Sequence, residues 1–305
     1  MAAGVVAAMG LDRAVGEPPE AFHPVALFGR LVGPLDRPWQ HPRLVGGVAA
    51  LVLPLVAAVA VASAVGVASA VSPLAGAAVA ASLLFSTISL RRLRAAATDV
   101  IDRSTDDPAG AREALLALAG READELSAGH VRSAAVESTA ENLSDGFVAP
   151  LAGFAVVGIV AGEFGTPPVA LAAATATAAW IKAVNTMDSM VGYRSKPVGW
   201  GAARLDDLAM WLPARLTAVA IAVAATNPGA LRDGSRWADA TASPNAGWPM
   251  ATLAAVLDAR LEKPDHYTLN AEAELPTAAT AHRGVEIVTR AGWLAALTTV
   301  VVVGV

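Results

Sequence analysis

Long uncharged apolar stretches alternate with short charged segments along the chain. Residues 44–90 contain no charged side chain, and Ser72-Pro73 interrupts them with a turn signal. A membrane-spanning helix needs about 20 consecutive apolar residues, so residues 44–71 and 74–90 predict a hairpin of two spanning helices. The alternative is a buried helix pair in a large soluble core, which an uncharged run of this length disfavours.

A second apolar stretch follows the same pattern. Glu163 is the only charged residue between positions 147 and 181, and Gly165-Thr166-Pro167-Pro168 divides the stretch. Residues 147–163 and 167–182 therefore predict a second hairpin. Arginines flank the first hairpin on both sides while its turn is uncharged, so the positive-inside rule places both of its ends in the cytoplasm. These arginines are Arg30, Arg37, Arg43, Arg91, Arg92 and Arg94.

The segments between and after the hairpins are more polar. We expect residues 91–146 to form a cytoplasmic helical insertion, because Thr105-Asp106-Asp107-Pro108 is a helix start signal before a leucine-rich pattern. Residues 232–290 carry six Lys and Arg residues, which favours a second, polar cytoplasmic segment. A single crossing by residues 208–225 would place that segment outside the cell. Either residues 208–225 are re-entrant or interfacial, or residues 248–257 help to return the chain to the cytoplasm. The apolar tail 291–305 is short for a full span.

The composition is that of a membrane protein. Hydrophobic residues make up 55% of the 305 residues, charged residues make up 16%, and the mean hydropathy is +0.51. Soluble domains carry about 25% charged residues. We therefore predict an all-α polytopic helical bundle, a single integral domain over residues 1–305 that crosses the cell membrane several times. The net charge of −5 argues against nucleic-acid binding, and the lack of cysteine excludes a disulfide or thiolate site.

The stretch before the second hairpin concentrates carboxylates. Glu137, Glu141 and Asp145 are spaced four residues apart, so a helix would place them on one face. Like charges at this spacing repel each other unless a cation lies between them, and Mg²⁺ prefers carboxylate oxygens. We therefore expect these three residues to bind Mg²⁺, with Asn142 beside them as a neutral oxygen donor. The alternative is a solvated acidic turn that caps a helix.

A second group of polar residues follows the second hairpin. Lys182, Asn185 and Asp188 precede Tyr193 and Arg194 within a few residues. Asn185 and Asp188 repeat the Asn-x-x-Asp spacing of the acidic stretch, which can place an amide and a carboxylate on one helical face. Metal or phosphate binding would use such a face.

A third group lies near positions 204–215. Asp206 and Asp207 are adjacent, so on a helix one of them would point to a site and the other to solvent. Arg215 is the only charged residue between positions 208 and 231, and such a residue normally faces a cavity or a partner. The acidic residues are the candidate partner, and the alternative is an arginine that snorkels to the interface. Further polar candidates are Arg204, Asn245 and His23.

The sequence lacks the motifs of several common nucleotide-binding and catalytic sites. The motifs G-x-x-x-x-G-K-[ST], strand-borne G-x-G-x-x-G, H-E-x-x-H and G-x-S-x-G do not occur. Their absence argues against a Walker loop, a dinucleotide fold, a zinc protease and a serine hydrolase. The remaining acids, bases and amides suit transfer chemistry on a phosphate-bearing substrate, in which Mg²⁺ and cationic side chains offset developing charge.

Four motifs, in one order, carry a resemblance to a known family. They are V-E-S-T-A-E-N-L-S-D-G-x-V-A-P-L, K-A-V-N-T-M-D-S-M-V-G-Y, A-A-R-L-D-D-L-x-x-W-x-P-A-R-L and S-P-N-A-G. With an N-terminal D-R-x-x-G-E-P-P-x-x-x-H-P-V-x-x-x-G-R, the chain resembles the CobD/CbiB family, the adenosylcobinamide-phosphate synthases of cobalamin biosynthesis. The resemblance runs from residue 12 to about residue 261. Thr241 and Met250 stand near S-P-N-A-G where this family often has His and Glu.

The resemblance implies a membrane ligase that joins adenosylcobyric acid to (R)-1-amino-2-propanol phosphate, or a related amino alcohol, through an amide bond. ATP and Mg²⁺ are the expected co-substrate and cofactor, and other membrane enzymes of the cobalamin pathway are expected partners. On this resemblance, we expect three sets of site residues. They are catalytic residues Asp145, Asp188, Asp206, Asp207 and Lys182; metal ligands Glu137, Glu141 and Asp145; and substrate-binding residues His23, Asn142, Asn185, Tyr193, Arg194, Arg204, Arg215 and Asn245.

Two other classes of membrane protein are the alternatives. A carrier for a corrinoid or another anion would also place charges at helix ends, but transporters often show inverted repeats, and none is evident in the sequence. A Mg²⁺-dependent transferase acting on a prenyl or lipid phosphate would usually carry repeated Asp-rich motifs. Here only the Asn-x-x-Asp spacing recurs.

Overall fold

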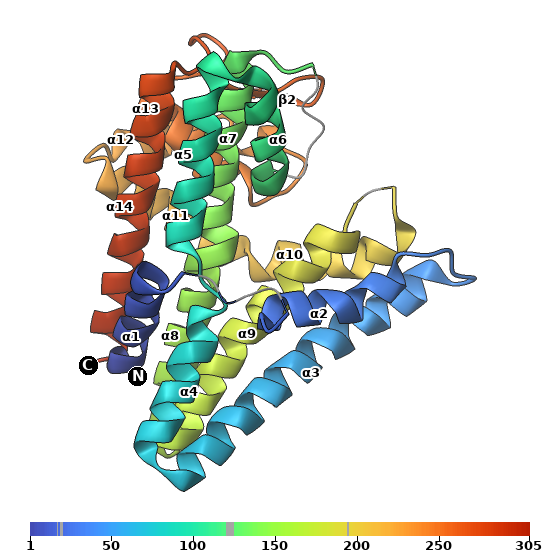
Figure 1. The fold of residues 1–305 in the computed structure, drawn as a ribbon, viewed down its shortest axis with the longest axis vertical. Coiled ribbons are helices and arrows are strands. Elements are labelled where there is room, and N and C mark those ends of the chain that lie inside the picture. The colour runs from blue at the N-terminus through green and yellow to red at the C-terminus, as the bar shows by residue number, and fades with distance from the viewer. Residues whose placement is uncertain (17, 19–20, 120–124, 194) are drawn as a thin grey trace. The chain divides into compact units, whose positions relative to one another are not determined.

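The computed structural model describes residues 1–16, 18, 21–119, 125–193 and 195–305. This part of the chain is almost entirely helical, with one hairpin of two short strands (Figure 1). It contains five helices long and apolar enough to cross a membrane, and a pair of shorter helices that form a sixth candidate. The predicted all-α polytopic membrane bundle is therefore confirmed. Internal contacts divide the chain into two compact units, each described by itself below.

The first unit comprises Met1–Ser89, Asp145–Met210 and Ala296–Val305. In its centre, α9 (Pro167–Val191) packs against α3 (Pro42–Val71), α4 (Pro73–Phe85) and α8 (Ala149–Phe164). Further elements of this unit are α1 (Ala2–Ala14), α2 (Pro24–Val32), η1 (Gly33–Leu35), most of η2 (Ser144–Val148), η3 (Pro197–Gly199), α10 (Trp200–Ala209) and the end of α14 (Ala278–Val302).

Both predicted helical hairpins are present in the first unit. The hairpin of α3 and α4 turns at Ser72, whose hydroxyl accepts a hydrogen bond from the Ala75 amide at 3.0 Å, as an N-cap does. Pro73 and Pro167 stand in the first turns of α4 and α9, where a missing N–H breaks no helical hydrogen bond. The turn signals in the sequence thus located both hairpins correctly.

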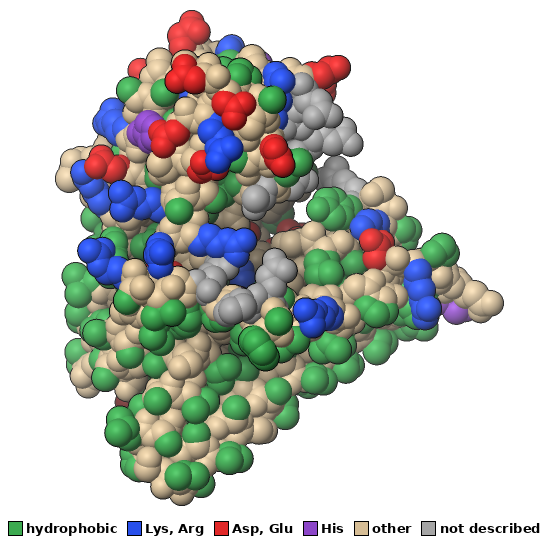
Figure 2. Space-filling model, viewed as in Figure 1, with side chains coloured by type: hydrophobic (Ala, Val, Ile, Leu, Met, Phe, Trp, Pro, Cys, Tyr) green, Lys and Arg blue, Asp and Glu red, His purple; other side chains and the backbone are tan. Residues whose placement is uncertain are grey.

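The surface of α3 is apolar along most of the length of this 30-residue helix. Hydrophobic side chains cover α3 and α4 in Figure 2, with few charged side chains among them. Soluble monomers rarely expose a contiguous patch of this kind, and lipid is the environment that suits it. The large exposed residues of α3 are Leu44, Val48, Leu51, Val52, Leu55, Val56, Val59, Val67 and Val71.

Glycines allow α10 and η3 to approach α3 very closely. A Cβ atom at Gly46 would lie 1.6 Å from the carbonyl oxygen of Val198, and one at Gly201 would lie 2.7 Å from the Cα of Gly47. No larger residue fits at these two positions without displacing backbone. This packing fixes the place of α10, which carries Asp206 in the middle of the third sequence motif.

We expect Gly46→Ala to destabilise the protein by about 1–3 kcal/mol, because the added methyl group would overpack against the Val198 backbone. Gly47→Ala is the matched control, since a Cβ atom at Gly47 meets nothing within 4 Å. Thermal unfolding of both variants in detergent measures the difference. Equal unfolding temperatures for the two variants would contradict this account of the packing.

The second unit comprises Leu90–Ser144 and Trp211–Ala295. The predicted insertion 91–146 nearly coincides with the first of these segments. Its helix start signal is confirmed, because Asp107 Oδ1 accepts a hydrogen bond from the Gly110 amide at 3.0 Å. The helices and strands of this unit are α5 (Leu90–Asp106), α6 (Pro108–Ala119), α7 (Ala128–Leu143), α11 (Trp211–Ala224), α12 (Gly229–Gly234), η4 (Ala238–Ala240), α13 (Gly247–Leu257), β1 (Leu261–Lys263), β2 (Tyr267–Leu269) and most of α14 (Ala278–Val302).

One expectation about the last third of the chain needs correction. The apolar tail 291–305 is not a short isolated segment, because it continues α14, which has 25 residues and is long enough to span a membrane. The short antiparallel pairing of β1 with β2 was not predicted, and it leaves the all-α fold class unchanged. Within residues 208–225, α11 (Trp211–Ala224) has 14 residues and is short for a full span by itself, so the alternatives given for this segment stay open.

Candidate functional site

The first unit brings together predicted residues from three of the four sequence motifs. The first motif supplies Asp145, the second supplies Asn185 and Asp188 on α9, and the third supplies Asp206 and Asp207 on α10. We call these five residues the acidic cluster. The helix α9 continues to Val191, beyond the predicted end of the second hairpin, and so holds Asn185 and Asp188 on rigid backbone.

Asn185 connects two carboxylates of the acidic cluster. Its amide nitrogen lies 3.5 Å from Asp145 Oδ2, and its side chain also hydrogen-bonds Asp206. The negative charges of Asp145, Asp188 and Asp207 act on Asp206, and the charge of Asp207 acts on Asp188. Four carboxylates from three segments of the chain thus lie close enough to repel one another. Such a group requires cations or protons nearby.

Two basic side chains border the acidic cluster. Lys182 lies beside the chain at Gly146, because a Cβ atom there would be 3.7 Å from Lys182 Nζ. Arg204 Nη1 donates to Asp207 Oδ2 at 3.2 Å. The exposed Arg204 therefore engages Asp207, whereas the neighbouring Asp206 has a buried carboxylate oxygen. The assignment of one of these adjacent aspartates to a site and of the other to solvent stays a prediction.

The acidic cluster suits a hydrated Mg²⁺ ion. The buried atoms Asp188 Oδ1 and Asp206 Oδ1 have no hydrogen-bond partner among the described residues, and unpaired buried oxygens are costly. The donors are hard oxygens, and Mg²⁺ typically uses one or two carboxylates together with water and substrate phosphates. The described residues contain no group of three or more His, Cys, Asp or Glu side chains placed to hold a metal. The protein would therefore supply only part of the coordination shell.

The three predicted metal ligands Glu137, Glu141 and Asp145 do not form such a group. Their common helical face is interrupted, because α7 ends at Leu143 and the following residues, Ser144–Val148 (η2), form a π-helical turn that contains Asp145. A proline follows this turn at position 150 and cannot donate a backbone hydrogen bond, which favours an irregular helix at this point.

Glu137 belongs to a buried hydrogen-bond network in the second unit. Its side chain is 0% exposed; Oε1 accepts from the Ser133 hydroxyl at 2.7 Å, and Oε2 accepts from the Tyr267 hydroxyl at 2.6 Å. Ser133 Oγ in turn accepts from the Glu262 amide of β1 at 2.7 Å. These bonds connect α7 to both strands of the hairpin, so these hydrogen bonds of Glu137 have a structural role.

Tyr267→Phe removes a hydrogen bond to this buried carboxylate, so we expect the free energy of unfolding to fall by about 1.5–3 kcal/mol. Tyr193→Phe is the control, because Tyr193 is the chain's other tyrosine and is 53% exposed. Chemical unfolding in detergent compares the two variants. If both unfold like the wild type, the network does not stabilise the second unit.

Arg215 is held between two tryptophans and the loop of the S-P-N-A-G motif. Its Cζ lies 4.6 Å from the ring centroid of Trp211 and 5.0 Å from that of Trp248, so both rings make cation–π contacts. Nη1 donates to the buried Asn245 Oδ1 at 2.8 Å and to the carbonyl oxygen of Trp211 at 2.8 Å. These contacts give Arg215 a neutral partner in the fourth motif, Asn245, and the charge of Asp239 also acts on it.

The other predicted site residues have local contacts. His23 caps α2, since its Nδ1 accepts from the backbone amide two residues later at 3.2 Å. The side chain of Asn142, in the second unit, donates to the carbonyl oxygen four residues earlier at 2.8 Å. The ring of Tyr193 lies 5.2 Å from Lys196 Nζ. Arg194 lies outside the described residues. The roles of these residues in substrate binding remain predictions.

Some of these contacts were not predicted from the sequence. Trp211 stands four residues before Arg215 on α11, so helical spacing was a usable signal for their contact. Tyr267 gave no such signal, because it is 130 residues from its partner Glu137. The π-helical turn at Asp145 had a signal in the proline at position 150.

Sequence comparison identifies relatives along almost the whole chain. The family described as CobD/Cbib protein matches residues 5–295. The probable cobalamin biosynthesis protein CobD of Methanothrix thermoacetophila is 32% identical, covering 96% of this chain and 94% of its own length. The cobalamin biosynthesis protein CobD of Rhodobacter capsulatus is 35% identical (95% and 93%), and that of Dehalococcoides mccartyi is 37% identical (86% and 84%). No solved structure matches the chain. The chain therefore belongs to the CobD/CbiB family.

Proposed function

We propose that the protein is a ligase of cobalamin biosynthesis. It joins adenosylcobyric acid to (R)-1-amino-2-propanol phosphate, or to a related amino alcohol phosphate, in an ATP-dependent reaction that forms an amide bond. Family membership and the names of the relatives support a role in cobalamin biosynthesis. The observation that carries the specific reaction is the acidic cluster with its two bordering cations, built from three family motifs within one unit.

The reaction requires activation of a free carboxylate, because direct condensation with an amine is uphill in water. A carboxylate oxygen of the corrinoid attacks the γ-phosphorus of ATP, the bond between that phosphorus and the bridging oxygen of ADP breaks, and ADP leaves. The resulting acyl phosphate is attacked at its acyl carbon by the amine nitrogen. Inorganic phosphate leaves with the electron pair of the C–O bond, and the nitrogen loses one proton as the amide forms.

Residues of the first unit carry groups suited to proton transfer, to charge stabilisation at the phosphate oxygens and to Mg²⁺ binding. We assign the proton transfer to Asp206, because its buried Oδ1 has no protein hydrogen-bond partner among the described residues. Lys182 and Arg204 supply positive charge for the phosphate oxygens. Asp145 and Asp188 would hold Mg²⁺, which when bound offsets negative charge on the phosphates.

The test is reconstitution with purified components. The protein in detergent is supplied with adenosylcobyric acid, aminopropanol phosphate, ATP and Mg²⁺, and mass spectrometry follows the corrinoid and ADP. We expect the condensed corrinoid only when all four components are present, and EDTA should abolish its formation. An unchanged corrinoid mass would contradict the proposal. Transport of unmodified corrinoid into proteoliposomes would instead indicate a carrier, and turnover of a prenyl phosphate would indicate a lipid phosphate transferase.

A further inference from the structure

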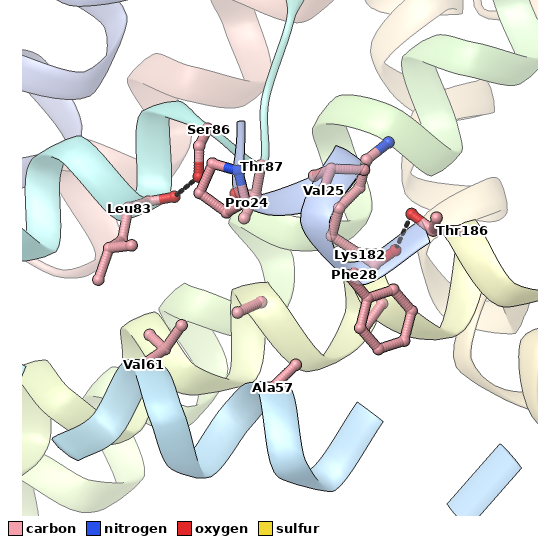
Figure 3. Close-up of a pocket in the computed structure, with 12 residues that line it drawn as sticks. Pro24, Val25, Phe28, Ala57, Val61, Leu83, Ser86, Thr87, Lys182 and Thr186 are labelled. Carbon is pink, nitrogen blue, oxygen red and sulfur yellow. Dashed lines mark hydrogen bonds between the residues drawn. The ribbon is translucent and has the colours of Figure 1, made fainter. Parts of the chain in front are cut away.

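Four helices of the first unit line a partly open cavity of about 60 Å³ (Figure 3). Helices α2, α3, α4 and α9 contribute its walls, and most of the lining is apolar. In Figure 3, Ala57 and Val61 project from α3 toward the interior, and Phe28 of α2 lies on another side. The main apolar lining residues are Pro24, Val25, Phe28, Ala57, Val61 and Leu83.

The hydroxyl groups in the lining are engaged within their own segments. Ser86, Thr87 and Thr186 each donate to a carbonyl oxygen three or four residues earlier, at 2.7 Å. The cavity has room for several atoms, since one water needs about 10–15 Å³ measured in this way. Because these hydroxyl groups already donate their protons to backbone carbonyls, the cavity walls favour apolar atoms over water.

Lys182 connects this cavity to the acidic cluster. Its side chain is part of the lining, while its Nζ lies near Gly146, the residue that follows Asp145. In Figure 3 the nitrogen of Lys182 points away from Ala57 and Val61. A small ligand could therefore place an apolar group between the helices and keep its charged groups beside Lys182 and Asp145.

We infer that this cavity receives the methyl group of the amino alcohol phosphate and thereby selects which amino alcohol is accepted. This inference rests on the function proposed above. The phosphate of that substrate is anionic and its amine is basic, so Lys182 and the carboxylates of the acidic cluster complement them. The methyl group is the part of the molecule that remains apolar. A nucleotide base or a corrin ring is far too large for about 60 Å³.

A competition assay tests the inference independently of the amount of folded enzyme. The protein receives adenosylcobyric acid, ATP, Mg²⁺ and an equimolar mixture of the phosphates of ethanolamine, 1-amino-2-propanol and 1-amino-2-butanol. Mass spectrometry then gives the ratio of the three products. Ala57→Leu fills the cavity, so the ratio should shift about tenfold or more toward ethanolamine, because a methyl group in an apolar pocket discriminates by this order. Val61→Ala enlarges the cavity and should shift the ratio toward 1-amino-2-butanol.

Ala60→Leu is the matched control, because Ala60 is an exposed residue of the same helix that does not line the cavity. Its product ratio should equal that of the wild type. If Ala57→Leu proves inactive, Val61→Ala decides the question. Wild-type product ratios for both cavity variants would overturn the inference while leaving the proposed function in place. A wild-type enzyme that forms no product from any of the three phosphates would refute the proposed function, and the inference with it.

Discussion

Asp206→Asn should lower the rate of condensed corrinoid formation by about 10²- to 10⁴-fold, the range expected when a general acid–base group is removed. The substitution keeps the shape of the side chain but removes the group that accepts a proton from the attacking amine. The effect should appear in kcat, because Asp206 lies among the carboxylates of the acidic cluster and acts in the chemical step. Single-turnover assays in detergent measure it directly.

Asp207→Asn is the matched comparison for Asp206→Asn. The two residues are adjacent on α10, but Asp207 is paired with the exposed Arg204, so its loss should reduce the rate by a much smaller factor. Both variants should reach the membrane fraction at wild-type levels. Turnover by Asp206→Asn within a few-fold of wild type would remove Asp206 from the proposed mechanism.

Lys182→Met should lower kcat/KM by about 10²- to 10³-fold, the loss typical of removing one group that stabilises developing charge. Methionine keeps most of the apolar side chain that lines the cavity, so the substitution tests the charge of Lys182 with little change in packing. The loss should be seen with each amino alcohol phosphate, because the phosphate is common to all of them.

Lys196→Met separates this local effect from a general loss of positive charge. Lys196 forms a partly exposed ion pair with Asp36 at 2.7 Å, and such pairs contribute only about 0.2–1 kcal/mol to stability. We expect its activity to stay near that of the wild type. Equal losses from the two lysine variants would show that Lys182 has no special role beside the acidic cluster.

The parts of the fold that depend on local sequence could be predicted. The two hairpins follow from uncharged runs longer than a bilayer requires, interrupted by Ser72-Pro73 and by the prolines before α9. The start of α6 follows from Asp107, whose side chain caps the helix next to it in sequence. In each case the residues that determine the structure lie within one turn of it.

The parts that depend on distant contacts could not be predicted. Equal spacing made Glu137 and Asp145 look like members of one helical face, but the partners of Glu137 are a serine on the same helix and Tyr267 on β2. A π-helical turn that contains Asp145 then replaces the regular helical spacing after α7. The residues of the cavity, such as Ala57 and Phe28, are ordinary apolar residues in the sequence, and only tertiary packing gives them a shared role.

The length of α3 has a consequence for the choice of lipid in any reconstitution. Thirty residues at about 1.5 Å each extend about 45 Å, whereas the hydrocarbon core of a bilayer is about 30 Å thick. A bilayer accommodates a helix of this length by tilt, by a kink or by local thickening, and each of these depends on the acyl-chain length of the surrounding lipids. Ala57 and Val61 belong to this helix and line the cavity, so we expect the size of the cavity available to the substrate's methyl group to differ between thin and thick membranes.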